Sequence, residues 1–257
     1  MKTIHAIEKK GKVLWLTTDH ETFSVEPDIM IKYHLKPGLT LDEKTYDLMI
    51  HDNQYLQCLK LAYTKLKKML TIQEMQTILA STPYAKGVQK QVVHMLIEKK
   101  YLDDYAYAKM YLELKKYKEG PEMMLYHLKE KGISQDILEQ TMMHYRESEM
   151  IKTIIEKKLS MPSKKPKRAL IQQIKNQLLV KGFHREVIES ILLASDELVD
   201  NQDEALIHRY GTKLFHAYQD KYSGHQLRQK VKEKLYQKGF AYEDIKHYLE
   251  TIDLQSW

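Results

Sequence analysis

Leu128-Lys-Glu-Lys-Gly132-Ile133 is a six-residue phrase that returns at Leu178-Leu-Val-Lys-Gly182-Phe183 and at Leu235-Tyr-Gln-Lys-Gly239-Phe240. The copies lie 50 and 57 residues apart. An apolar residue stands four positions before each leading leucine: Met124, Ile174 and Val231. Another follows five positions after each Ile or Phe: Leu138, Ile188 and Ile245. Since a four-residue spacing places two side chains on one helical face, each phrase ends an amphipathic helix.

The Lys-Gly pair marks the end of that helix. Glycine adopts the left-handed conformation without the cost of a Cβ atom, about 1–2 kcal/mol, and is therefore typical of the position just past a helix C-terminus. A single Lys-Gly pair is a common way for a helix to end. Three copies with matching apolar residues on both sides predict an array of repeated units, each reading helix, tight stop, apolar plug and next helix.

The composition is that of a folded, helical and basic protein. Hydrophobic residues make up 43% and charged residues 30% of the 257 positions, which excludes a disordered chain. Only nine Gly and six Pro are present, which favours long helices with few loops. A net charge of +6 favours an acidic partner such as nucleic acid, an acidic protein face or a membrane surface.

Cysteine usage and the N-terminus indicate the compartment. Cys58 is the single cysteine, so no intrachain disulfide can form, which suits a reducing compartment. The first residues lack the apolar core of a signal peptide, and no apolar run approaches the length of a membrane span. We therefore expect a cytoplasmic protein that does not associate with a membrane.

The N-terminal region reads as strands followed by helices. Residues 3–25 alternate between apolar and polar side chains, which predicts a small β meander that needs another element to pack on. Pro27 opens a short helix that the turn at Lys36-Pro37-Gly38 is expected to stop. Thr40-Leu-Asp-Glu43 and Thr71-Ile-Gln-Glu74 both have the form of a capping box, and each predicts the start of a helix.

The predicted fold class is mainly α: an elongated, curved array of tandem three-helix units, preceded by a small N-terminal β meander. Asp103 and Asp104 are expected to cap the first helix of the second unit. An acidic linker, residues 196–204, joins the last two units and is expected to cap the helix that follows. The predicted domains are 1–39 for the meander with its short helix, 40–102 for the first unit with its leading helix, 103–146, 147–197 and 198–257.

No motif for catalysis, cofactor binding or metal binding is present. The sequence lacks GxxxxGK[ST], GxGxxG, GxSxG and HExxH, and its histidines are scattered singly. No second cysteine or cluster at ligand spacing supports a metal site. The sequence predicts a protein that is not an enzyme and has no catalytic, cofactor or metal residues.

Clusters of basic residues are the more informative feature. They fall on corresponding helices of different units, so we expect them to form one basic face that meets phosphates, whose binding would weaken as salt rises. A merely solvated helix surface is the alternative. The residues of this candidate basic face are Lys115, Lys116, Lys118, Lys164, Lys165, Lys167, Arg168, Lys175, Lys181, Arg185, Arg228, Lys230, Lys232, Lys234 and Lys238.

One segment and its surroundings resemble a known family. Tyr101-Leu-Asp-Asp-Tyr-Ala-Tyr-Ala108, followed by Gly120 and by Lys131-Gly-Ile133, is similar to the central signature of the RecX regulatory proteins of bacteria. The N-terminal meander is similar to that of their longer members. The resemblance implies structural roles for Tyr101, Asp103, Asp104, Gly132, Gly182 and Gly239.

The chain departs from that family in two places. Ser81-Thr-Pro-Tyr-Ala-Lys-Gly87 stands where the first unit normally carries a Lys-Gly turn. Lys109, Lys115 and Lys116 stand where the family often has arginine in the helix after the Asp-Asp pair. Lysine keeps the positive charge but loses the bidentate fork of arginine.

The resemblance implies a modulator of the RecA recombinase in homologous recombination, DNA repair and the SOS response. Such a protein binds the RecA filament on single-stranded DNA, lies along its groove and restrains filament growth, ATP hydrolysis and strand exchange. The expected partners are the RecA filament, single-stranded DNA and also double-stranded DNA, and we expect a monomer. Two alternatives remain: an autonomous DNA-binding protein that uses helix-turn-helix-like basic repeats, and a protein scaffold that binds no nucleic acid.

Overall fold

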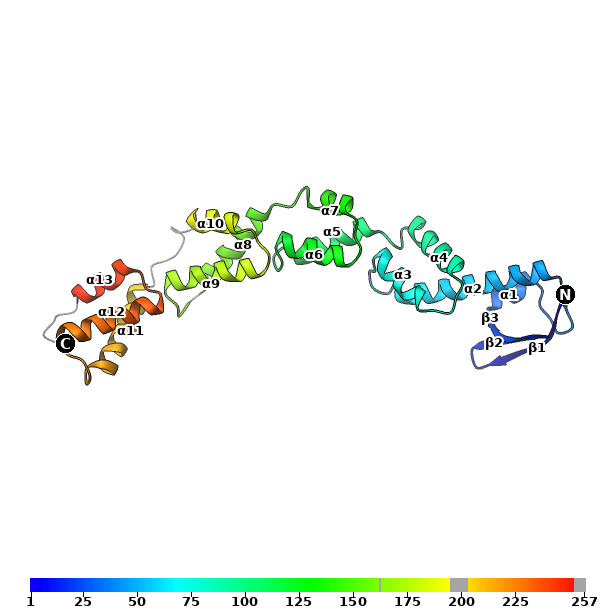
Figure 1. Ribbon diagram of the computed structural model, residues 1–257, viewed down its shortest axis with the longest axis horizontal. Helices are drawn as coiled ribbons and strands as arrows, with labels where there is room; N and C mark the ends of the chain where they lie inside the picture. The colour runs from blue at the N-terminus through cyan, green and yellow to red at the C-terminus, as the bar shows by residue number, and fades with distance from the viewer. Residues whose placement is uncertain (162, 195–202, 252–257) are drawn as a thin grey trace. The chain divides into compact units, whose positions relative to one another are not determined.

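The computed structural model describes residues 1–161, 163–194 and 203–251. Over these residues the chain is mainly helical with a sheet at its N-terminal end, as the sequence predicts (Figure 1). It divides into two compact parts, Met1–Tyr111 with Leu128–Thr141 and Leu112–His127 with Met142–Trp257, which are described separately.

The predicted meander is confirmed as three antiparallel strands. These are β1 (Lys2–Lys10), β2 (Val13–Thr18) and β3 (Thr22–Val25). A short fourth strand, β4 (Thr40–Leu41), pairs with β1 and gives the sheet the order β3-β2-β1-β4. The predicted capping box at Thr40 is therefore wrong, because Thr40 and Leu41 pair with β1 and the helix cap lies further along the chain.

Two helices pack against this sheet. α1 (Pro27–Lys32) opens on Pro27 as expected but ends before the Lys36-Pro37-Gly38 turn. α2 (Glu43–Lys65) is capped by Asp42, whose Oδ1 accepts a hydrogen bond from the Thr45 N–H at 3.0 Å. The sheet and these helices share one core, which includes Tyr46 and Met49 of α2.

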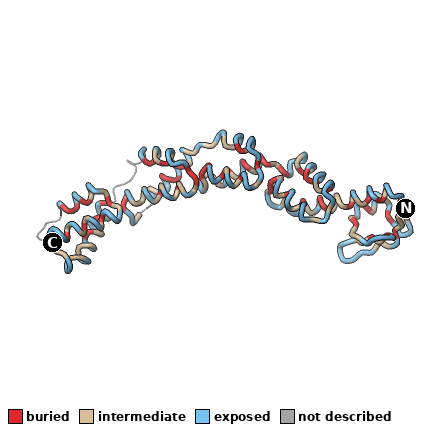
Figure 2. The backbone as a smooth tube through the Cα atoms, viewed as in Figure 1, coloured by how far each residue is buried: buried red, intermediate tan, exposed pale blue. Residues whose placement is uncertain are grey.

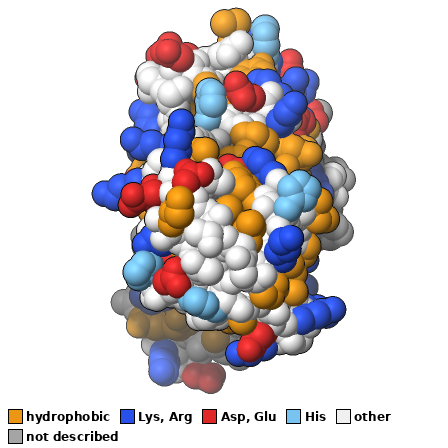
Figure 3. Space-filling view, turned by 90° about the vertical axis from the view of Figure 1, so that its right-hand side faces the viewer, with side chains coloured by type: hydrophobic (Ala, Val, Ile, Leu, Met, Phe, Trp, Pro, Cys, Tyr) orange, Lys and Arg blue, Asp and Glu red, His pale blue; other side chains and the backbone are white. Residues whose placement is uncertain are grey.

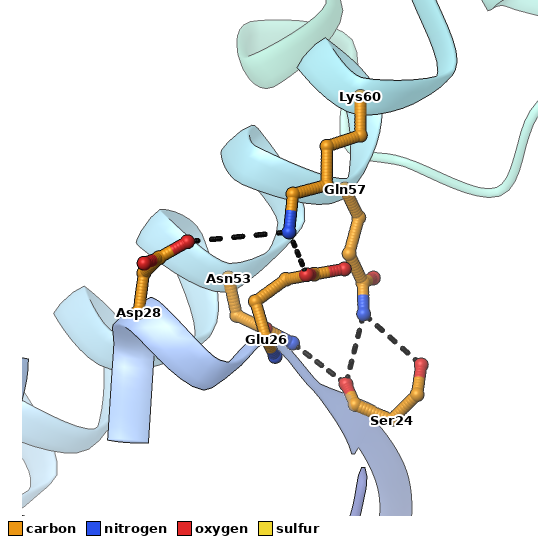
Figure 4. Close-up of polar contacts among 6 residues, drawn as sticks. All are labelled: Ser24, Glu26, Asp28, Asn53, Gln57 and Lys60. Atoms are coloured by element: carbon orange, nitrogen blue, oxygen red, sulfur yellow. Dashed lines mark hydrogen bonds and ion pairs between the residues drawn. The ribbon is translucent and has the colours of Figure 1, made fainter. Parts of the chain in front are cut away.

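Polar side chains of α2 fasten it to the end of β3 (Figure 4). Buried Asn53 donates to the Ser24 carbonyl at 2.8 Å, and its Oδ1 accepts from the Glu26 N–H at 2.9 Å. Gln57 donates to the same Ser24 carbonyl at 2.9 Å, and Lys60 pairs with Glu26. α2 lies wholly within the predicted domain 40–102, yet it packs against the meander of the predicted domain 1–39 and supports it.

From α2 onward the helices follow the predicted order, three to each unit (Figure 1). α3 (Ile72–Ala80) begins with the predicted capping box of Thr71 and Glu74, which is confirmed. The remaining helices are α4 (Lys86–Glu98), α5 (Asp104–Lys115), α6 (Pro121–Glu130), α7 (Gln135–Met142), α8 (Glu147–Leu159), α9 (Lys167–Val180), α10 (Arg185–Ala194), α11 (Asp203–Tyr218), α12 (Gly224–Lys238) and α13 (Tyr242–Thr251).

Buried residues recur at intervals along each helix, so that each helix turns only one side to a core (Figure 2). The helices α2–α4, α8–α10 and α11–α13 each enclose a hydrophobic cluster of their own. The predicted boundaries at 102/103 and 146/147 fall between helices and stay predictions. The boundary at 197/198 and most of the acidic linker lie outside the described residues.

All three Lys-Gly phrases form the helix stop that the sequence predicts. Gly132, Gly182 and Gly239 have φ angles of +79°, +81° and +97°. In each copy the N–H of the following Ile or Phe bonds back to the carbonyl of the leading leucine: Ile133 to Leu128, Phe183 to Leu178 and Phe240 to Leu235. The glycine N–H also bonds back to the residue three before it, which completes a Schellman motif.

The first unit uses a different stop. Gly87 lies in the first turn of α4 and has no positive φ, so it is not an equivalent of the Lys-Gly turn. α4 ends at Glu98, and Lys100 just beyond it takes the place of the glycine, with a φ of +60° and a bond from the following Tyr101 N–H to the Leu96 carbonyl. Lysine is not typical of this conformation, so this helix stop could not be predicted from the residue type.

Candidate nucleic-acid interface

The Lys-Gly turns join consecutive three-helix units. Each turn lies against the N-terminus of the second helix of the preceding unit, and we call these places the first, second and third joints. In the first joint, the Thr71 hydroxyl donates to the Lys131 carbonyl at 2.8 Å, and Lys131 Nζ lies 2.6 Å from Glu74 Oε1. Gly132 contacts Gln73 so closely that a Cβ atom would collide with that side chain. Side chains of the α3 N-terminus thus satisfy the Lys131 carbonyl of the turn and pair with its lysine.

Buried carboxylates complete the first and third joints. Asp104 Oδ1 accepts from the N–H of Ile72, the first residue of α3, at 2.9 Å. Asp203 accepts from the N–H of Lys167, the first residue of α9, at 2.9 and 3.1 Å. Each carboxylate opens the first helix of one unit and caps the second helix of the unit before it. Burial raises the pKa of both carboxyl groups above the ordinary value.

The second joint lacks this carboxylate. α6 begins with Pro121, which has no N–H to offer, and the Gly120 N–H donates to the Lys181 carbonyl at 2.6 Å. Glu147, which opens α8, instead accepts from the N–H of His184 at 2.7 Å and lies 2.8 Å from its Nδ1. The hydrogen bond to Glu147 raises the pKa of His184.

The family-signature residues therefore have distinct structural roles. Asp103 caps α5 as predicted, since its Oδ1 accepts from the Ala106 N–H at 3.0 Å. Asp104 does not cap its own helix, because its carboxylate is turned to α3. Tyr101 lies edge-on to Tyr63 with 5.3 Å between ring centroids.

The basic residues of the candidate face differ in whether their side chains have partners within the protein. Four of its fifteen members pair with carboxylates of the described residues: Lys115 with Glu119, Lys116 with Glu113, Lys175 with Glu189 and Lys230 with Glu233. Arg228 donates to the Leu249 carbonyl at 3.0 Å, near the end of α13. The side chains classed as exposed are Lys118, Lys164, Lys165, Arg168, Arg185 and Lys238; those classed as partly buried are Lys115, Lys116, Lys167, Lys175, Lys181, Arg228, Lys230, Lys232 and Lys234. That they share one continuous face stays a prediction.

At the third joint, several basic residues lie against aromatic rings. The Arg168 guanidinium lies 4.9 Å from the ring centroid of Tyr236, and Lys238 Nζ lies 4.9 Å from that of Tyr210. Lys232 Nζ lies 4.6 Å from the ring centroid of Tyr242. We call these six residues the aromatic-basic cluster. The combination suits a nucleic acid, since the cations can meet phosphates and the rings can meet bases.

Sequence reasoning found only part of this cluster. Arg168, Lys232 and Lys238 belong to the predicted basic face, and Tyr236 lies in the third Lys-Gly phrase. Tyr210 and Tyr242 were missed, because Tyr210 comes from α11 and the tertiary fold alone brings it to Lys238. A basic residue next to an aromatic one in sequence is the only signal that was available, and it says nothing about pairs between helices.

Other surfaces differ from this cluster. Figure 3 faces the sheet-bearing end of the first part, where Lys and Arg are interspersed with Asp and Glu. An apolar hollow of about 480 Å³ between α3 and α4 is lined by Leu79, Val93 and Ile97 and edged by Lys86 and Lys90. Among the described residues, no His, Cys, Asp or Glu side chains gather into a group able to hold a metal ion. None of the described helices combines the length and the apolar character needed to span a membrane.

Comparison with known proteins places the chain in a family. It is 30% identical over 240 residues to the regulatory protein RecX of Halalkalibacterium halodurans, covering 90% of both chains. The chain belongs to the RecX family of regulatory proteins. Regulatory protein RecX of a Geobacillus species, strain WCH70, is 29% identical and matches over 90% of this chain and 87% of its own.

A family profile and solved structures agree with this. Residues 202–249 match the profile described as "RecX, third three-helix domain". A crystal structure of regulatory protein RecX shares the fold with a TM-score of 0.53, at 22% identity over 74% of this chain and 98% of that one. RecX from Lactobacillus salivarius gives a TM-score of 0.50, at 24% identity over 56% of this chain and 98% of that one. The family description counts the α11–α13 unit as third, whereas it is fourth here because α2–α4 is counted as the first.

Proposed function

We propose that this RecX-family chain binds the RecA filament on single-stranded DNA and restrains filament growth, ATP hydrolysis and strand exchange. Membership of a family of regulatory proteins, over 90% of the chain, is the observation that carries the proposal. The proposed role needs no catalytic group in this protein, because a binder changes the behaviour of a filament through binding energy alone.

The construction of the chain supports this role. Successive helical units are fastened by buried hydrogen bonds at their joints, so one molecule can offer several neighbouring surfaces to a partner made of repeated subunits. A regulator that contacts several subunits favours the filament geometry in which all of those contacts form. It shifts the equilibrium between two geometries only by its difference in affinity for them.

The candidate basic face supports contact with the DNA of that filament. Lys164, Lys165 and Arg168 are exposed. Arg168 belongs to the aromatic-basic cluster, and the Lys164 carbonyl accepts a hydrogen bond from the hydroxyl of Tyr210 in that cluster. Lysine or arginine that meets a phosphate releases counterions, and the binding weakens as salt rises. We therefore expect a salt-dependent contribution to filament binding from the segment that opens α9.

The test is the rate of ATP hydrolysis by RecA on single-stranded DNA as this protein is added well below one copy per RecA. We expect the rate to fall at such ratios. Replacing Lys164, Lys165, Lys167 and Arg168 with Glu is expected to weaken the inhibition and leave the fold intact. The matched control replaces four exposed lysines of the N-terminal region with Glu: Lys9, Lys10, Lys12 and Lys36.

The outcomes separate this proposal from its rival. If the α9 variant inhibits as strongly as the parent, the basic residues there are only a solubilising surface. The aromatic-basic cluster also suits the rival function, autonomous DNA binding. The rival would replace the RecA proposal if the protein does not inhibit RecA up to stoichiometric amounts and binds naked duplex tightly in the same buffer.

A further inference from the structure

A hollow of about 350 Å³ lies on the last three-helix unit, between α12 and α13. Its walls include Lys232, Tyr236 and Tyr242. Tyr236 is 49% exposed and Tyr242 is 50% exposed, so a large part of each side chain is open to solvent. The volume lies within the range of small-molecule sites, roughly 300–1,000 Å³. Two open aromatic side chains therefore line one hollow large enough for a planar group.

Cations fix both rings. Arg168 reaches across from α9 to the Tyr236 ring, and its Nη2 lies 3.4 Å from the Tyr236 hydroxyl. Lys232 lies over the Tyr242 ring and its Nζ lies 3.3 Å from the Tyr242 hydroxyl. The rings are thus held in place before any ligand arrives, which lowers the entropy cost of binding.

The charge around the hollow is positive. Glu233 is the one acidic lining residue, and its carboxylate is 2.8 Å from Lys230 Nζ and 2.9 Å from Gln237 Nε2. Lys232, together with Arg168 beside Tyr236, adds positive charge that no carboxylate on the lining offsets. A ligand that suits the site combines flat aromatic groups with negative charge.

We propose that Tyr236 and Tyr242 stack against bases of single-stranded nucleic acid while Arg168 and Lys232 meet its phosphates. An acidic peptide would pair with the cations but would bring no flat group to stack on the two exposed rings. A duplex presents its phosphates but keeps its bases stacked on one another, so it cannot use the rings. The inference deepens the proposed function, since it names the part of the chain that touches the single strand in a filament.

The experiment measures binding of full-length protein to fluorescein-labelled oligothymidine of about 20 nucleotides, longer than a typical single-strand site. Fluorescence anisotropy is recorded without RecA. We expect the double variant Tyr236→Ala with Tyr242→Ala to bind at least about 30-fold more weakly than the parent, since two stacking contacts are lost. The double variant Tyr236→Phe with Tyr242→Phe keeps both rings and is expected to bind within about twofold of the parent.

Two controls separate stacking from general effects. Tyr105→Ala with Tyr126→Ala removes two other exposed tyrosines, of 38% and 57% exposure, and is expected to bind as the parent does. A duplex of the same length is expected to bind the alanine and parent proteins alike. Lys232→Gln is expected to lower the salt slope by about 0.7, the value for one single-strand phosphate contact, while the tyrosine variants leave that slope unchanged.

Several results would overturn the inference. These are unchanged oligothymidine binding by the Tyr236 and Tyr242 alanine variant, an equal loss in the phenylalanine variant, or an equal loss on duplex. Failure of the parent to bind oligothymidine overturns it too, yet leaves the RecA proposal standing if ATP hydrolysis by RecA is still inhibited. Loss of oligothymidine binding in the alanine variant, from a parent that does not inhibit RecA, supports the inference and rejects the proposed function.

Discussion

The second and third joints differ in what stands at the start of the helix that the Lys-Gly turn contacts. At the third joint the first N–H of α9 meets the buried carboxylate of Asp203. At the second joint the first residue of α6 is Pro121, which has no N–H, and the backbones approach so closely that Gly120 faces Gly182. The comparison teaches that a buried carboxylate is present at this position only where a helix N–H would otherwise lack an acceptor.

The largest effect is expected from a side chain at the second joint. A Cβ atom at Gly120 would collide with the backbone of Gly182 and Phe183, which cannot move aside as a side chain can. Gly120→Ala is therefore expected to lower the free energy of unfolding by about 3 kcal/mol. Denaturant unfolding followed by circular dichroism measures it. Gly87→Ala is the control, because Gly87 has open space around it; an equal loss in both variants would mean that the close approach at the joint does not matter.

A smaller loss is expected at the third joint. Asp203→Ala leaves the Lys167 N–H without its acceptor and is expected to cost about 2 kcal/mol in unfolding free energy. Asp203→Asn keeps an acceptor oxygen and should cost less. Adding Lys167→Pro to Asp203→Ala removes the orphan donor, as Pro121 does at the second joint, and should recover part of the loss. Pro166, the preceding residue, has φ −56° and ψ 149°, an extended conformation that is compatible with a proline at position 167. If the double variant recovers none of the lost stability, the missing acceptor is not the cause of the loss.

The next prediction separates the cost of a left-handed backbone at Gly182 from the cost of a collision with its neighbours. Gly182 and Gly38 have nearly equal φ angles, +81° and +84°, but a Cβ atom on Gly182 would lie 2.9 Å from the Met123 nitrogen while Gly38 has open space. Gly182→Ala should therefore destabilise by about 1 kcal/mol more than Gly38→Ala. The difference between the two melting shifts reports the contact alone. Equal shifts would show that the left-handed conformation is the whole reason for glycine in the Lys-Gly phrase.

The smallest effect is a pH dependence confined to the second joint. Its hydrogen bond to Glu147 raises the pKa of His184 above the ordinary 6.5, and Glu122 and Glu186 act in the same direction. The stabilisation is complete below the unfolded-state pKa and is lost as pH rises through the folded-state pKa. The parent should lose about 0.5 kcal/mol more than His184→Gln between about pH 6 and pH 9, since half-exposed pairs contribute little. Parallel pH profiles for the two proteins would remove His184 from the joint.

Local signals were reliable where the local backbone decides the outcome. The Lys-Gly phrase predicted the helix stop, and all three glycines have positive φ with the expected return hydrogen bonds. The same four-residue capping pattern was right at Thr71 and wrong at Thr40. Nothing in either sequence distinguishes them, because Thr40 fails as a cap only through the pairing of β4 with β1.

Contacts between units could not be predicted from the sequence, because they too depend on tertiary packing. Asp103 and Asp104 look alike, yet one caps α5 and the other caps α3 of the preceding unit. Lys131 looks like a surface lysine of the phrase, yet it pairs with Glu74 across the first joint. The basic residues were found by counting charges, but their carboxylate and tyrosine partners were not.

The repeat, the helix stops and the family could be predicted from the amino-acid sequence, because residue spacing and glycine conformation act over a few neighbouring residues. The neighbours of each Lys-Gly turn, in contrast, are set by the packing of the helices. The joints depend on hydrogen bonds and close backbone approaches between residues some 32 to 63 positions apart, such as Asp104 with Ile72 and Gly120 with Lys181. Such pairs exist only once the helices are packed, since no local preference brings a particular donor to a particular acceptor over that distance.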